Sequence, residues 1–324
     1  MSSWHAQVRA ALFAAWDDAG LPDPARGMGP YREAIARAPA PIDVPPDTEG
    51  PLNRELVDRV HGFGVAIGRA LADMLALPDG ASTDAAVAWC GRFNLSISLL
   101  DYVCDESGRV DALEGLEPFR TLSGRSAPPP TTATLEERVV SELAVALLTE
   151  LDASPARPAE WLPLVRDLYA AEVITARESY TTARSTDEVR ALLRTKSAGP
   201  FALMATRLSA GADDAARESA SALGAAVGAL FWLADDAADL WLDLSRGAWN
   251  MFLVDVAAHD ATLLGAPASP FRDAAVVRLL GRHDVAARSA REVGDELVAA
   301  LARVPAQSGQ QDGLAVVAAA LSVW

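Results

Sequence analysis

The sequence predicts an all-α protein, built as a bundle of long antiparallel helices. Alanine, leucine and valine dominate a chain of 324 residues that is 51% hydrophobic, whereas β-branched and aromatic runs are scarce. That composition favours helices. Apolar residues also recur every three or four positions between breaks rich in proline, which is the period of an amphipathic helix. No segment alternates well enough to be a strand, and the chain has no internal repeat of about 20–50 residues.

The predicted helices follow one another from break to break. Proline-rich or polar segments separate them, at 38–51, 127–130, 153–163 and 305–313. Ser82-Thr83-Asp84 is a candidate N-cap for the third helix, and Thr134 with Glu137 resembles a capping box that starts the fourth. We expect helices at 3–19, 52–77, 84–106, 134–152, 159–183, 187–209, 214–244, 248–264, 271–282, 284–303 and 313–323.

Charge and cysteine usage exclude several classes of function. The net charge is −16 and Lys196 is the only lysine, which argues against a surface for nucleic acid or for anionic membranes. Cys90 and Cys104 form no CxxC or Cys/His cluster, so a reducing compartment fits and a thiolate zinc site does not. The N-terminus lacks a basic start and a cleavage site, and no apolar stretch reaches ~20 residues. We therefore expect a cytoplasmic protein without stable membrane insertion.

Acidic residues interrupt one of the most apolar segments, GALFWLADDAADLWLDLSRGAWN. Asp235, Asp239 and Asp243 are four residues apart, so on a helix their side chains line one face with a slow drift. Continuing towards the N-terminus, Phe231 and Val227 extend the same face. The carboxylates thus form the end of an apolar stripe.

An earlier segment, FNLSISLLDYVCDES, repeats this design. Asp101 and Asp105 are four residues apart, with Glu106 adjacent. Ile97, Phe93 and Trp89 continue that face towards the N-terminus at steps of four. Two predicted helices therefore share an apolar strip that ends in stacked carboxylates.

Two interpretations compete for these clusters. Acidic runs are usually solvated helix ends, and either cluster alone fits that explanation. Together they fit it less well, because Asp235 and Asp239 have apolar neighbours on both sides and buried like charges need neutralisation. Facing carboxylates offer the oxygen ligands that hard divalent cations prefer, with room for water and a phosphate. Mg²⁺ bridging to a diphosphate is the sharper hypothesis.

Four motifs in order resemble those of the class I isoprenoid synthase superfamily, nearest to trans-isoprenyl diphosphate synthases and bacterial class I terpene synthases. The segment Asp101-Tyr-Val-Cys-Asp105-Glu106 resembles the first DDxxD motif, and Asp235-Asp236-Ala-Ala-Asp239 matches the second. RTKSAGPFALMA at 194–205 resembles the KTxxLF segment, and Asp243-Leu-Ser-Arg-Gly resembles DLxxG. The similarity covers roughly residues 52–300. It implies a helical bundle with a central active-site cavity.

The chain departs from the elongating prenyltransferases in three places. The helix RELVDRVHGFGVAIGRALADML carries no GGKxxRP motif, and Arg109 after the first acidic motif has no second arginine beside it. A tryptophan–leucine–alanine sequence replaces the glutamine before the second motif. In this family these basic groups hold the diphosphate of isopentenyl diphosphate, so the departures weaken the case for a second substrate.

The resemblance implies a role for each of these residues. The expected metal ligands are Asp101, Asp105, Asp235, Asp239 and Asp243, which would hold Mg²⁺, three ions in number, with Mn²⁺ as a substitute. The expected partners of the diphosphate are Arg190, Arg194, Lys196 and Arg246. Of all these, we expect catalysis to depend on Asp101, Asp105, Asp235, Asp239, Arg190 and Lys196.

The resemblance also implies a dry apolar cavity beside the acidic residues. Ionisation of a prenyl diphosphate forms a carbocation, and water would quench it. Aromatic faces stabilise cations, which favours aromatic residues in its wall. Tyr102 suits either the wall or the core, and Trp241 suits the core. The expected lining residues are Trp89, Phe93, Ser96, Ile97, Phe231 and Trp232.

The expected function is that of a terpene synthase, a Mg²⁺-dependent lyase that ionises one allylic prenyl diphosphate, farnesyl or geranylgeranyl diphosphate. Two alternatives stay open: a trans-prenyltransferase that adds isopentenyl diphosphate, and a non-catalytic partner subunit. We expect a homodimer of a single domain over 1–324. Within it, 1–50 would be a helical extension with a proline-rich segment, 52–303 the catalytic bundle and 313–324 a C-terminal helix.

Overall fold

The structure, a computed structural model, describes residues 2–37, 42, 48–106, 108–123, 132–153, 158–180, 184–307 and 309–324. Every regular element in these ranges is a helix, so the predicted all-α class is confirmed. The proline-rich break at 127–130, and parts of those at 38–51 and 153–163, lie outside the described residues. No described helix is long and apolar enough to cross a membrane. The division into parts within one domain stays a prediction.

The helices follow the chain as α1 (Ser2–Asp18), α2 (Pro24–Arg37), η1 (Gly50–Leu52), α3 (Arg54–Met74), α4 (Ala81–Asp101), η2 (Tyr102–Glu106), α5 (Val110–Glu114), α6 (Phe119–Ser123), α7 (Leu135–Asp152), α8 (Pro158–Arg177), α9 (Thr186–Leu208), α10 (Asp214–Arg246), α11 (Met251–Asp260), α12 (Thr262–Gly265), α13 (Pro270–Arg282), α14 (Val285–Leu301) and α15 (Gly309–Val323). Here η1 is a short 3₁₀-helix and η2 is a single π-helical turn.

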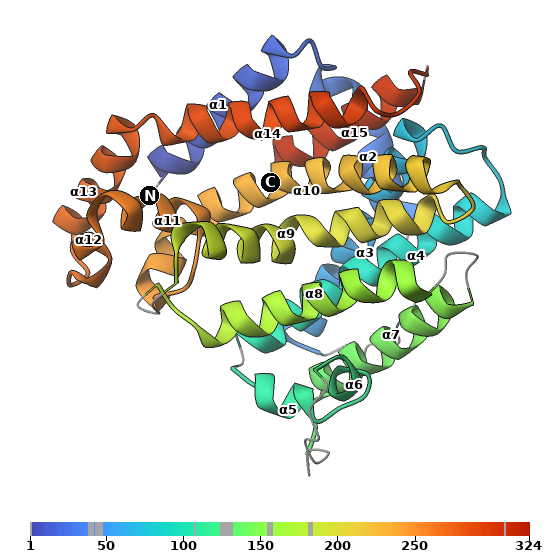
Figure 1. The fold of residues 1–324 in the computed structure, drawn as a ribbon, viewed down its shortest axis with the longest axis horizontal. Coiled ribbons are helices and arrows are strands. Elements are labelled where there is room, and N and C mark those ends of the chain that lie inside the picture. The colour runs from blue at the N-terminus through green and yellow to red at the C-terminus, as the bar shows by residue number, and fades with distance from the viewer. Residues whose placement is uncertain are drawn as a thin grey trace.

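The long helices lie roughly alongside one another (Figure 1). In that view α14 crosses the top, α10 and α9 run beneath it, and α8 follows below them. Helix α9 packs extensively against α10 on one side and against α8 on the other, and α4 packs between α3 and α7. This order brings the C-terminal end of α4 towards α8 and α9, where the acidic residues of the candidate site lie.

Two capping boxes begin helices that carry site residues. At α7, Thr134 accepts a hydrogen bond from the backbone of Glu137, whose side chain accepts one from the Thr134 backbone, as predicted. Ser185 and Glu188 form an equivalent box at the start of α9. The cap expected for α4 is wrong. Helix α4 begins at Ala81 after Gly80, and Thr83 donates instead to the Pro78 carbonyl.

Helix α2 is absent from the predicted set because Gly27, Gly29 and Pro30 within it read as a break. Packing explains the glycine at 27, since a Cβ there would overlap the backbone of Ala315 in α15. Close contact with α15 therefore outweighs the poor helix propensity of this segment.

Other predicted helices differ from the structure in where they end, or are divided into two. The short helices α5 and α6 are additional, and α8 ends at Arg177, earlier than expected. The predicted helix 248–264 divides into α11 and α12 at Ala261. Helix α15 begins at Gly309, so the predicted C-terminal helix is confirmed and is longer than expected.

Helix α10 lies at the centre of the core and is buried along most of its length. Its close approach to α9 depends on two glycines. A Cβ at Gly224 would overlap the Phe201 carbonyl, and one at Gly228 would lie 2.7 Å from the Ala198 Cα. Small residues here therefore set the distance between the helices that carry Lys196 and Asp235.

The Gly224→Ala substitution is predicted to lower the free energy of unfolding by about 1–3 kcal/mol, because the added methyl has no space between α9 and α10. The matched control is Gly281→Ala in α13, where no atom lies within 4 Å of the new Cβ. It should gain roughly 0.5 kcal/mol from better helix propensity. Urea denaturation of both variants checks this, and equal effects would contradict the packing argument.

Candidate functional site

The first acidic wall lies where α4 ends. Asp101 is the last residue of α4, and Asp105 lies in the π-helical turn η2 that follows. Single π-helical turns are rare and occur frequently at functional sites. The two carboxylates stay on the same side despite the altered turn, since both reach the Lys196 ammonium group.

The second acidic wall lies on α10. Asp235, Asp239 and Asp243 line the same cavity as Asp101 and Asp105, as the spacing of four predicts. Helix α10 ends at Gly247, whose φ of 74° lets it close the helix in the left-handed conformation. Its N–H donates to the Asp243 carbonyl, so the DLxxG-like segment fixes the end of this wall.

Lys196 on α9 joins the first wall to α8. Its Nζ lies 2.8 Å from Asp101 Oδ1, 2.5 Å from Asp105 Oδ2 and 3.3 Å from Glu172 Oε2. Burial alone would lower the pKa of Lys196, but the three carboxylates raise it well above its ordinary value. The ammonium is therefore the resident cation among these acids.

The two walls enclose a cavity of about 330 Å³. Its lining has seven acidic and three basic residues, so the cavity is strongly negative. The acidic ones are Asp101, Asp105, Glu178, Asp235, Asp236, Asp239 and Asp243, and the basic ones are Arg177, Lys196 and Arg246. Arg177 pairs with Glu114, and Glu178 pairs with Arg184, and neither partner lines the cavity.

Burial and mutual repulsion disturb the carboxylates of α10. The Asp235 carboxylate opens onto the cavity, yet surrounding protein shields it from bulk water, and Asp239 and Asp101 repel it. Together these raise its pKa to about 7. Burial likewise raises the pKa of Asp243 to about 6, although a hydrogen bond from Asn250 opposes the shift. Such crowding is relieved by a cation.

Asp236 has a structural role that differs from that of its neighbours. Because it is one residue off the acidic stripe, its carboxylate turns towards α11 and accepts hydrogen bonds from the Met251 N–H at 2.6 Å and from Trp232 Nε1 at 2.9 Å. Asn250 adds bonds to the Asp236 carbonyl and to Asp243 Oδ2, both at 2.8 Å. These contacts lock α11 against the end of the α10 wall.

An apolar pocket of about 50 Å³ lies below the first wall, between α4, α6, α7 and α8. Four expected lining residues meet there: Trp89, Phe93, Ser96 and Ile97. The Trp89 and Phe93 rings stack with centroids 4.8 Å apart. Ile97 is one helical turn before Asp101, so this pocket continues the face of α4 that ends in the carboxylates.

Phe231 and Trp232 lie elsewhere than expected. Phe231 stacks on Phe201, with centroids 5.4 Å apart, and meets Phe63 edge-on at 5.1 Å. It therefore fills the bundle between α3, α9 and α10 and lines neither of the cavities described above. Trp232 turns towards Asp236 and α11, because it shares the face of α10 that holds Asp236 rather than the acidic stripe.

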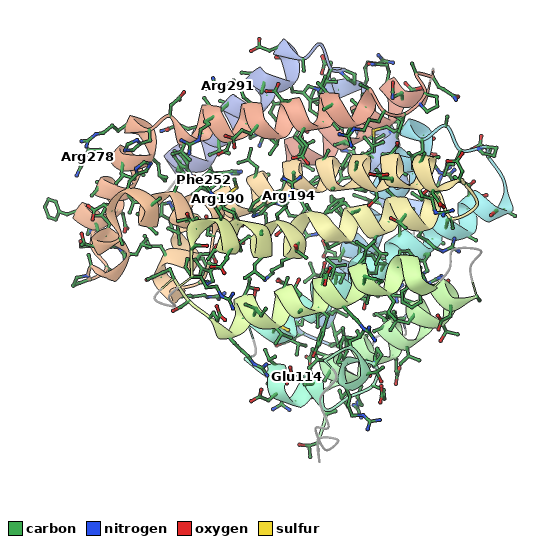
Figure 2. The ribbon with its side chains drawn as sticks, viewed as in Figure 1. Glu114, Arg190, Arg194, Phe252, Arg278 and Arg291 are labelled. Carbon is green, nitrogen blue, oxygen red and sulfur yellow. The ribbon has the colours of Figure 1, made fainter. Side chains whose placement is uncertain are left out.

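The arginines Arg190 and Arg194 are also placed away from the acidic cavity. They line another pocket, of about 240 Å³, with Trp232, Asp255 and residues of α14. Arg190 donates to Asp255 at 2.6 Å, and Arg194 pairs with Glu296. Figure 2 shows both on the side of α9 that faces α14, away from α8. A helix advances 100° per residue, so positions two and six before Lys196 point elsewhere.

Arg109 takes part in an ion pair with a buried carboxylate. Its guanidinium donates to Glu137 Oε1 at 2.5 Å, and the Glu137 side chain is fully buried. Arg109 does not line the acidic cavity. The geometry thus gives this arginine a structural task, holding the start of α7 to the loop after η2.

Glu172 is the site residue that sequence reasoning missed. It lies on α8 within an apolar run, LYAAEVIT, and its side chain is 3% exposed. Burial raises its pKa to about 8, and the Lys196 ammonium opposes that rise. Apolar neighbours on both sides are a feature that Glu172 shares with Asp235, but Glu172 has no second acid four residues away to mark it.

The donor set fits hard divalent cations in one specific way. No three Asp, Glu, His or Cys side chains in the described part of the chain converge on a single ion. The walls offer pairs of carboxylates instead. Mg²⁺ typically takes one or two carboxylates, keeps several waters and completes its shell with substrate phosphate oxygens. Asp101 with Asp105, and Asp235, Asp239 and Asp243, would hold ions in that manner.

The raised pKa of Asp235 predicts a pH-dependent gain from Asp235→Asn. The unfolded carboxyl titrates near 3.8 and the folded one near 7, so the folded chain binds more protons between these values. Stability from this group is lost as pH rises through that window. Asp235→Asn should therefore raise the free energy of unfolding more at about pH 8 than at about pH 5.

Urea denaturation at both pH values measures the difference between Asp235→Asn and wild type. Glu218→Gln, an exposed position on the same helix, is the matched control and should show no such trend. A gain for Asp235→Asn that is constant or shrinks with rising pH would contradict the argument.

Comparison with known proteins places the fold. No model of a known protein family matches the chain, and no curated protein matches it in sequence. A polyprenyl synthase from Roseobacter denitrificans is similar in structure, with a TM-score of 0.52 and 16% identity over 99% of both chains. A decaprenyl diphosphate synthase from Rhodobacter capsulatus has a TM-score of 0.51 and 14% identity, over 96% of this chain and 98% of that one. The chain thus has the helical isoprenoid synthase fold, as its motifs predict.

Proposed function

We propose that the protein is a class I terpene synthase, which ionises one allylic prenyl diphosphate with Mg²⁺ and releases diphosphate. The observation that carries the proposal is the negative cavity between α4 and α10. Two carboxylate walls line it, and Lys196 joins the first wall to Glu172 of α8. When bound, Mg²⁺ supplies Lewis-acid neutralisation of the leaving diphosphate.

In the proposed reaction, the acidic residues of the cavity bind cations and the basic residues bind diphosphate. Asp101 and Asp105 on one wall, and Asp235, Asp239 and Asp243 on the other, hold the cations. Lys196 and Arg246, which also line the cavity, donate to diphosphate oxygens. Arg190 and Arg194 are engaged with acids on the other side of α9, so we no longer assign them this role.

The prenyl chain lies along α4 in the apolar pocket that begins one turn below Asp101. Its stacked Trp89 and Phe93 rings exclude water and present aromatic faces to a carbocation. The pocket of about 50 Å³ is far smaller than ligand pockets of about 300–1,000 Å³. A chain of 15 or 20 carbons therefore requires the leucines of α7 and α8 that line the pocket to move aside.

The alternative is a trans-prenyltransferase that condenses isopentenyl diphosphate with an allylic primer. It is favoured by the two similar structures, which are a polyprenyl synthase and a decaprenyl diphosphate synthase. The engagement of Arg109 with Glu137 favours the single-substrate reaction, because it leaves this arginine outside the cavity where a second diphosphate would bind. The expected homodimer stays a prediction under either function.

Incubation with allylic diphosphates and radiolabelled isopentenyl diphosphate separates the two functions. The purified protein receives geranyl, farnesyl or geranylgeranyl diphosphate with Mg²⁺, and extracts are analysed by gas chromatography and for chain length. We expect hydrocarbon or alcohol products without incorporated label. A lengthened prenyl diphosphate that carries the label would establish the prenyltransferase instead.

The Asp101→Asn and Asp239→Asn variants are predicted to lose at least about a hundredfold in kcat/KM while staying folded. Each removes a cation-binding carboxylate, and this loss corresponds to roughly 3 kcal/mol of transition-state stabilisation. Glu150→Gln on α7, which pairs with Arg92 away from the cavity, is the control and should keep its activity. Turnover by either aspartate variant at the wild-type rate would place the site elsewhere.

The Ser96→Phe variant is predicted to shift preference towards shorter diphosphates without changing Mg²⁺ dependence. Ser96 lines the pocket below Asp101, while Phe93 lies two turns down, at roughly 12 Å. We expect the wild type to use C15 and C20 substrates, with C20 preferred and C10 poor. Relative rates on the three diphosphates measure this. If Ser96→Phe has the same relative rates on the three diphosphates as wild type, the prenyl chain does not bind in this pocket.

A further inference from the structure

Lys196 contacts two kinds of carboxylate. Asp101 and Asp105 line the cavity, and their side chains are 46% and 33% exposed. Glu172 lies behind Lys196, is 3% exposed and does not line the cavity, although Thr175 and Ala176 of the same helix do. One carboxylate thus faces Lys196 from the protein interior, and the other two face it from the solvent side.

The contact between Lys196 and Glu172 is incomplete. Their charged atoms are 3.3 Å apart, compared with 2.8 Å and 2.5 Å for the two aspartates. Glu172 Oε2 is buried, and no described residue makes a well-aligned hydrogen bond to it. A buried carboxylate oxygen whose donor is poorly placed is costly, so Glu172 gains from a closer ammonium group.

Asp101 and Asp105 are also the carboxylates that our proposed function assigns to a divalent cation. Lys196 satisfies them in this structure, so cation and ammonium compete for the same oxygen atoms. A lysine with no other partner would resist displacement, because its side chain is only 16% exposed and would lose its counter-ions inside the protein.

We propose that Glu172 is a positioning residue, the second counter-ion to which Lys196 retreats when a divalent cation takes Asp101 and Asp105. Lys196 then remains charged and ordered at the wall of the cavity, beside the diphosphate. Glu172 acts through Lys196 and touches neither the cation nor the substrate. The inference rests on the proposed function, since it concerns the same cavity.

Binding of Mn²⁺ in the presence of inorganic diphosphate tests this without any turnover. Electron paramagnetic resonance measures free Mn²⁺, and hence the affinity, for four proteins: wild type, Glu172→Gln, Lys196→Met and the double variant. Glu172→Gln should weaken binding by about tenfold, because Lys196 then has no alternative counter-ion and keeps competing. In the Lys196→Met background, the same substitution should change the affinity less than about twofold.

Several results would overturn the inference. Equal affinity of Glu172→Gln and wild type would do so, and so would an equal weakening in both backgrounds, which would reveal a direct effect of charge. Glu150→Gln controls for the loss of one negative charge and should bind Mn²⁺ as wild type does. If Glu172→Gln fails to fold, Glu172→Asp replaces it and should weaken binding by a smaller factor in the Lys196 background only; equal weakening in both backgrounds would again refute the inference.

The same binding experiment distinguishes failure of the proposed function from failure of the role of Glu172. Wild type that binds no Mn²⁺ with diphosphate present would refute the cation site itself. Wild type that binds Mn²⁺ while Glu172→Gln binds it equally well would refute only the role of Glu172. Circular dichroism of each variant confirms that the comparison concerns folded proteins.

Discussion

Repulsion among carboxylates held in an apolar bundle is the constraint on which the rest of the site depends. Asp235 and Asp243 have raised pKa values because burial and neighbouring acids both disfavour their ionised forms. Such crowding is relieved by protonation of a carboxyl or by a nearby cation. In this structure Lys196 compensates part of it, at the first wall. The remaining negative charge is the basis of the proposed site for divalent cations.

The bundle holds this strained arrangement in place from both sides. Helix α10 approaches α9 closely through Gly224 and Gly228, so the helices that carry the second wall and Lys196 are in tight contact. Asp236 and Asn250 hold α11 to the end of α10 by hydrogen bonds, one of them fully buried. Rigid elements of this kind keep charged groups at the separations that a pre-organised site needs. Stability and function thus draw on the same contacts.

Periodicity in the sequence is enough to predict the acidic face of α10 and the apolar face of α4. Steps of four residues place the carboxylates of α10 on one face, and they place Ile97, Phe93 and Trp89 below Asp101, as the structure has them. Periodicity does not say what faces a helix. The positions of Arg190 and Arg194 therefore could not be predicted, because they are set by ion pairs with Asp255 of α11 and Glu296 of α14. Phe231 shares the stripe of Asp235 yet packs on Phe201. Glu172 becomes part of the site because α8 lies beside α9.

A crystal structure with Mn²⁺ and inorganic diphosphate tests the central claim most directly, because anomalous scattering locates each ion. We expect ions between α4 and α10, within about 2.0–2.3 Å of oxygens of Asp101 or Asp105 and of the α10 aspartates, bridged by diphosphate. Ions bound without contact to either wall would contradict it. So would diphosphate bound beside Arg190 and Arg194, because the charge of the acidic cavity would then need another explanation.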